Sequence, residues 1–205
     1  RNYKFMKKLL KILIIYLLVF LPSPSLANEK EHNIQIVYEL LKEKKFKEGI
    51  KHLKKFSEHN DIDSQLLYSK ILFSGDLTPQ NFENSYFWGF SALLGGLKKS
   101  SKILEKLEDY LTDKQIEEIR NKLEEFLKKR AFEKDKRAII QIAKLYENFT
   151  EPPDFINAYT WYNIAVAQGI KTAKPKRDEV LDNLNEKELL DAQSLSIKLF
   201  NKINN

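Results

Sequence analysis

Residues 155–169 read FINAYTWYNIAVAQG, and the fold can be inferred from this stretch. Phe155, Ala158, Trp161, Ala165 and Gly169 follow one another at steps of three, three, four and four, so they lie on one stripe of an α-helix. The small side chains of Ala158 and Ala165 let a neighbouring helix approach closely, and Trp161 fills the space beside them. Gly169 is predicted to adopt the left-handed conformation that ends a helix. The stretch therefore predicts one helix of a packed pair.

The chain repeats this pattern, because 66–129 can be laid on 139–202 without a gap. Both tryptophans of the chain, Trp88 and Trp161, then fall on each other. Ala92 and Gly96 of the earlier copy likewise match Ala165 and Gly169. A shift about half as long as the one that lays residue 66 on residue 139 adds a weaker copy. In this copy Phe46, Gly49, His52, Phe56 and Asn60 fall on Phe82, Ser85, Trp88, Ala92 and Gly96. Short repeat periods of this kind are typical of solenoids built from stacked supersecondary units.

The pattern outside these helices is helical as well. Thr112 and Gln115 form a predicted capping box, and Asn185 and Glu188 form its counterpart at the matching positions of the later copy. We find no alternation typical of strands. The prediction is an all-α fold, an α/α superhelix (solenoid) of antiparallel helix pairs in a single domain over 28–205. Its helix pairs are expected at about 34–60, 66–100 and 139–173, with additional helices at 103–130 and 172–203.

Residues 1–27 have the pattern of a secretory signal peptide. Lys7, Lys8 and Lys11 precede an apolar run at 12–21, and Ser25 and Ala27 place small residues at the −3 and −1 cleavage positions. A retained membrane anchor is the alternative, but a spanning helix needs about 20 apolar residues. We therefore expect cleavage before Asn28, a periplasmic or secreted protein and no stable membrane anchor afterwards.

Charge and cysteine content exclude several classes of function. The chain has 35 basic and 29 acidic residues, but five of the basic ones precede residue 28, which leaves 30 against 29. Nucleic-acid binding needs a basic face, so we expect no nucleic-acid partner. The absence of cysteine rules out disulfides, thiolate metal sites and a cysteine nucleophile.

The run AYTWYNIAVAQG at 158–169 resembles the second helix of the Sel-one-like repeat family, relatives of the tetratricopeptide repeats. The match is clearest over 139–173 and weaker over 66–100, where Ser85 replaces the first Ala. Over 34–60 only the outline is kept. The resemblance implies a non-enzymatic scaffold or adaptor for a protein or peptide partner, often in secreted or periplasmic bacterial proteins. It implies no catalytic, cofactor-binding or metal-binding residues.

Three tyrosines are the candidate partner-binding residues: Tyr86, Tyr159 and Tyr162. Tyr86 and Tyr159 stand two residues before a tryptophan, about 200° around the helix, so they are expected to face away from the packed side. The matching positions Trp88, Ala92, Gly96, Ala158, Trp161, Ala165 and Gly169 are interpreted as structural.

Alternative functions remain open at this point. Glu117 and Glu124 could act as the paired carboxylates of a cell-wall glycan hydrolase. The basic residues around them favour exposed ion pairs instead. Glu48, His52 and His59 share one predicted helix, but a fourth metal ligand is missing. A chaperone-like envelope accessory protein is the third possibility.

Overall fold

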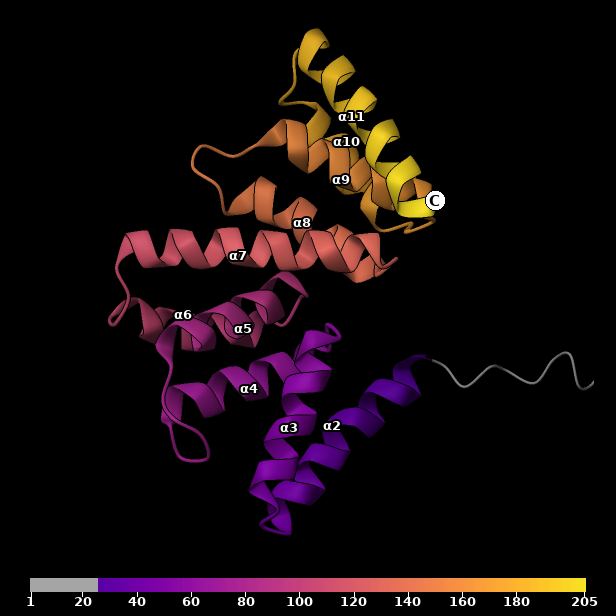
Figure 1. Cartoon of the computed structure of the whole chain (residues 1–205). Coiled ribbons are helices and arrows are strands. Elements are labelled where there is room, and N and C mark those ends of the chain that lie inside the picture. Colours follow the sequence, from indigo (N-terminus) through magenta and orange to yellow (C-terminus); the bar gives the residue numbers. More distant parts are fainter. Residues whose placement is uncertain (1–25) are drawn as a thin grey trace, which may run out of the picture.

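The computed structural model describes residues 26–205, so residues 1–25 of the predicted signal peptide lie outside the described residues. The helices are α2 (Leu26–Lys42), α3 (Phe46–Glu58), α4 (Ile62–Ser74), α5 (Phe82–Leu94), η1 (Lys98–Ser100), α6 (Ser101–Glu108), α7 (Asp113–Phe132), α8 (Lys136–Asn148), α9 (Phe155–Ala167), α10 (Ala173–Leu181) and α11 (Glu186–Asn204). The described part contains no strand, and consecutive helices pack on each other as an elongated stack (Figure 1). The predicted all-α architecture of packed helix pairs is confirmed.

The longer repeat interval corresponds to a unit of four helices. When 66–129 is laid on 139–202, α5 coincides with α9, and α7 begins where α11 begins. The packing repeats as well: α5 contacts α4, α6 and α7, whereas α9 contacts α8, α10 and α11. The sequence prediction treated 103–130 and 172–203 as helices added to the repeat. In the structure they supply its third and fourth helices, which cover the face of α5 or α9 that the first pair leaves open.

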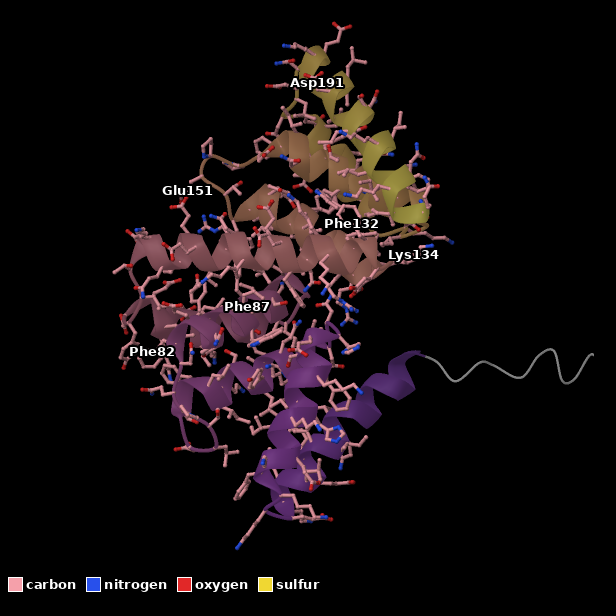
Figure 2. All side chains as sticks on the ribbon, in the orientation of Figure 1. Phe82, Phe87, Phe132, Lys134, Glu151 and Asp191 are labelled. Carbon is pink, nitrogen blue, oxygen red and sulfur yellow. The ribbon has the colours of Figure 1, made fainter. Side chains whose placement is uncertain are left out.

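Helix α7 joins the two four-helix units. It packs against α8 and also contacts α11. Figure 2 shows Phe132 at the end of α7 that faces α11, where Lys202 Nζ lies 4.4 Å from the centroid of the Phe132 ring. The apolar side chains of both units belong to one buried cluster, so the units share a core and cannot shield it separately.

The conformation of the residues that end the helices also repeats along the chain. Gly169 has a φ of 81°, which confirms its predicted left-handed conformation, and the matching residues Gly96 and Asn60 adopt the same conformation with φ of 105° and 60°. Lys44 and Lys134 adopt the same conformation, with φ of 59° and 66°. The backbone amides of each of these residues and its successor close the preceding helix turn, as in a Schellman motif. Lysine was not expected there, because a side chain makes this conformation costly.

The helix starts confirm both predicted capping boxes. Thr112 Oγ1 accepts a hydrogen bond from the Gln115 backbone amide at 3.3 Å, and Asn185 Oδ1 accepts one from the Glu188 backbone amide at 3.0 Å. In both boxes the Gln115 or Glu188 side chain accepts a hydrogen bond from the backbone amide of the capping residue. These caps satisfy backbone donors that a helix start leaves unpaired.

The α2–α3 pair is attached differently from the other helices. Its apolar side chains form a separate small cluster around Val37, Leu53 and Ile71. The buried Asn60 side chain, in the turn after α3, donates to Gln141 Oε1 at 2.7 Å and to Asp135 Oδ2 at 3.0 Å. These hydrogen bonds, between the turn after α3 and the N-cap and first half of α8, link this pair to α8.

Candidate partner-binding surface

The three candidate tyrosines are buried, so the expectation that they form an exposed surface is wrong. Tyr86, Tyr159 and Tyr162 are 7%, 6% and 1% exposed. The expectation assumed that the repeat helix has one covered face. Helices α5 and α9 instead have neighbours on several sides, so residues on opposite sides of the helix are both covered. Trp88 and Trp161 are buried for the same reason, at 8% and 1% exposed.

Two tyrosine hydroxyls of the second unit, those of Tyr146 and Tyr162, make internal hydrogen bonds. Tyr162 donates a hydrogen bond of 2.5 Å to Glu147, and Tyr146 donates one of 2.6 Å to Glu124. Burial raises the pKa of both phenols, and the hydrogen-bonded carboxylates raise it further. A neutral phenol held on a carboxylate is a structural donor, so these residues stabilise the helix packing.

The repeat helices also pack through aromatic rings. Trp88 lies 6.0 Å from the Tyr68 ring and 5.7 Å from the Phe126 ring, measured between centroids. Phe87 reaches Phe126 at 5.6 Å, and Figure 2 shows Phe87 between α5 and α7. These contacts fix α7 on α5 and thereby shape the surface on either side.

A hollow of about 410 Å³ opens between α5, α6 and α7. Its apolar part includes Phe90 and Phe149, whose ring centroids are 4.9 Å apart. Tyr86 also lines the hollow, and its charged residues are Glu105, Glu108, Asp113 and Arg120. We refer to this as the acidic hollow, because its lining includes three carboxylates and one guanidinium.

A second hollow, of about 350 Å³, lies between α4 and α6. Phe73 and Ile103 contribute apolar surface, and four lysines surround it: Lys70, Lys99, Lys102 and Lys106. Lys99 is 3.8 Å from Asp63. The two hollows therefore carry opposite charge on either side of α6.

The proposed carboxylate pair of a glycan hydrolase is not assembled. Glu124 accepts hydrogen bonds from Tyr146 and, at 2.5 Å, from Lys128. Glu117 is exposed one heptad earlier on the same helix, about 10.5 Å away along the axis at about 1.5 Å per residue. Glycosidase carboxyl groups lie about 5–9.5 Å apart across a sugar site. Glu124 is therefore already engaged by a lysine and a tyrosine hydroxyl, whereas no ion pair of Glu117 occurs among the described side chains.

The histidine-containing segment does not form a metal cluster. His59 Nδ1 lies 2.7 Å from the Lys55 carbonyl oxygen, and the His52 ring packs 5.8 Å from Phe56. Among the side chains that the structure describes, no group of three potential His, Cys, Asp or Glu ligands comes together. Within 26–205, no helix has both the length and the apolar character needed to cross a membrane.

Comparison with known proteins gives a distant likeness. No protein-family model and no curated protein matches the chain. Among solved structures, it is similar to a protective antigen of uropathogenic Escherichia coli strains that displays an SLR fold, with 16% identity and a TM-score of 0.30. The similarity covers 76% of this chain and 41% of the antigen, so the chain spans less than half the length of the antigen.

Proposed function

We propose that this protein is a secreted or periplasmic, non-enzymatic helical-repeat scaffold that binds a protein or peptide partner. The observation that carries the proposal is the doubled four-helix unit with a shared core. Stacked repeats of this kind present extended surfaces, which is how solenoid proteins recognise partners. The two charged hollows beside α6 give this surface local chemical character.

The rival functions receive less support. Glycan hydrolysis would require two carboxylates on opposite sides of a sugar, whereas Glu117 and Glu124 lie along one helix. A chaperone-like role would need exposed apolar surface for unfolded clients. Of the exposed large apolar residues in the described part, Leu190 and Ile197 share α11, whereas Tyr38, Phe46 and Tyr110 come from three other segments.

Site-specific photocrosslinking in the source cell would test partner binding. A photoreactive amino acid at Lys102, which borders the basic hollow, or at Glu105, in the acidic hollow, should give a product of discrete mass. The same group at Asp191, on α11 far from both hollows in Figure 2, serves as the control. Failure to obtain a product at either α6 position would contradict the proposal.

Two further measurements address export and the rivals. The amino-terminal sequence of the mature protein should begin near Asn28, and mature soluble protein that retains residues 6–27 would contradict export. Zymography on peptidoglycan should give no clearing. Clearing that disappears in Glu117→Gln or Glu124→Gln would instead establish the hydrolase.

A further inference from the structure

We infer that the acidic hollow between α5, α6 and α7 is a docking site for a basic side chain, lysine or arginine, of the partner polypeptide. This inference rests on the proposed function and specifies the chemistry of the partner. Its evidence is the charge of the hollow, the aromatic floor, and a comparison between the two four-helix units.

The charge of the hollow is unbalanced. Glu105, Glu108, Asp113 and Arg120 are the charged residues that line it, which gives a net charge of −2. Among the described side chains, those of 34–205, none of these four belongs to an ion pair, although ion pairs occur elsewhere on the surface. The local charge therefore attracts a cation from outside the chain.

The floor of the hollow suits the stem and head of a basic side chain. Tyr86, Phe90 and Phe149 form a chain of aromatic contacts, with centroid distances of 6.0 and 4.9 Å. Tyr86 is 7% exposed, and its hydroxyl makes no hydrogen bond within the described residues although the residue lines the hollow. Burial raises the Tyr86 pKa, Glu108 raises it further and Arg120 lowers it, so these charges act near the phenol. Aromatic faces attract cations, and the alkyl stem of lysine or arginine packs on apolar surface.

The second unit already contains a cation at the corresponding place. When the two units are laid on each other, Leu104 falls on Arg177 and Glu105 falls on Asp178. Arg177 donates to Asp178 Oδ1 at 2.6 and 2.9 Å. It also reaches 3.5 Å from Asn163 Oδ1, the equivalent of Phe90. The same fold thus holds a guanidinium of its own in one unit, whereas the equivalent residue in the other unit is the uncharged, buried Leu104.

The other equivalent residues of the two units also differ in charge. Ser101 is matched by Lys174, and Asp113 by Glu186. At the compared positions the second unit therefore has two basic and two acidic side chains, whereas the first unit has one basic and three acidic side chains. Glu108 and Arg120 are matched by the uncharged Leu181 and Gln193. Of the two units, the first alone combines this aromatic lining with excess negative charge.

NMR titration with two tripeptides tests the site directly. Acetyl-Gly-Arg-Gly-amide carries the cation, and acetyl-Gly-citrulline-Gly-amide is its neutral isostere. In ¹H–¹⁵N spectra at low salt, the arginine peptide should shift amides of α5, α6 and the first half of α7, with a Kd of about 1 mM or weaker. The citrulline peptide should bind about tenfold more weakly.

Charge variants with a matched control separate the site from general electrostatics. Glu105→Gln/Glu108→Gln/Asp113→Asn should weaken arginine-peptide binding about tenfold. Glu39→Gln/Asp182→Asn/Asp191→Asn makes the same change in net charge at exposed positions elsewhere and should leave the Kd unchanged. Arg120→Gln should tighten binding about threefold, because it removes the cation that competes for the carboxylates.

Transplanting the arrangement of the second unit is the strictest variant. Phe90→Asn/Leu104→Arg should fill the hollow with an internal guanidinium and abolish peptide shifts, provided that the thermal unfolding curve shows a folded protein. The surface carboxylate variants keep the test valid if this core change unfolds the chain.

Three results would overturn the docking site: no shifts with the arginine peptide, equal binding of the citrulline peptide, or an unchanged Kd in the triple carboxylate variant. These outcomes are independent of the crosslinking experiment. A protein that gives a crosslinked partner but fails this titration retains its scaffold function without the basic-side-chain site.

Discussion

Asn60 and Gln141 are joined by a hydrogen bond of 2.7 Å although they lie far apart in the chain, and both side chains are buried. Gln141 in turn donates to the Ser91 carbonyl oxygen at 2.9 Å, and Gln65 donates to Asn60 Oδ1 at 3.1 Å. Asn60 therefore has two tasks. Its left-handed backbone ends α3, and its amide connects the α2–α3 pair to α5 and α8 through Gln141.

Replacing Asn60 should separate these tasks. Asn60→Gly keeps the left-handed conformation but removes the donor to the buried Gln141 Oε1 and one of the two acceptors of Gln65 Nε2, so the free energy of unfolding should fall by about 2–3 kcal/mol. Asn60→Ala should cost about 1 kcal/mol more, because it adds the strain of a side chain at positive φ. Urea denaturation measures both. Equal stability of Asn60→Gly and wild type would show that the network contributes nothing net.

The left-handed helix ends predict substitutions of opposite sign. Lys134 is exposed with φ of 66°, so Lys134→Gly should raise the free energy of unfolding by about 0.5–1 kcal/mol. At Gly169 no atom lies within 4 Å of an added Cβ, so Gly169→Ala should lower it by about 1–2 kcal/mol through backbone strain alone. Thermal and urea unfolding check both signs. Lys134→Ala, which retains a Cβ at this φ, is the control and should be nearly neutral.

Gly95 is required for close packing on α4. A Cβ built there would lie 2.3 Å from Ile62 Cγ2, so Gly95→Ala should destabilise the protein by about 1–3 kcal/mol. Ile62→Ala removes the clashing atom and should recover part of this loss in a double-mutant cycle. Gly96→Ala is the matched control, because no atom lies within 4 Å of its Cβ and Ile62→Ala should not rescue it. Additive effects of Gly95→Ala and Ile62→Ala would contradict the steric explanation.

Alkaline pH should destabilise the second unit through Tyr146 and Tyr162. Burial and then the bonded carboxylates raise both folded-state pKa values, whereas an unfolded tyrosine titrates near its ordinary value of about 10. Above about pH 10 the unfolded chain loses these protons while the folded chain retains them, so the free energy of unfolding falls as pH rises. Well below this pH both states hold the protons, so the linkage leaves stability unchanged there.

The measurement is urea denaturation at several pH values from neutral to about pH 11. Tyr146→Phe/Tyr162→Phe should reduce the slope of stability against pH in the alkaline range, at the expense of lower stability at neutral pH. Tyr38→Phe, at a residue that is 52% exposed, is the control and should keep the slope of the wild type. A double variant with an unchanged slope would contradict the assignment.

The candidate site was harder to predict than the fold. Tyr86 and Trp88 do lie on different sides of α5, but this separation indicates exposure only when one side of the helix faces water. Because α6 and α7 cover that side, both residues are buried. The acidic hollow could have been suspected from the repeat itself: at the position of Arg177 the earlier copy has Leu104, and this difference removes an internal cation.

The local structure of this protein follows from its amino-acid sequence. Apolar spacing set the helices, and the residues at Thr112, Asn185, Gly96 and Gly169 set where they begin and end, because capping and left-handed turns depend on neighbours in the chain. Which faces remain open was settled by tertiary packing instead. Burial depends on what packs against a helix from elsewhere, so four helices rather than two form the unit, and the open, charged surface lies beside α6 instead of at the tyrosines.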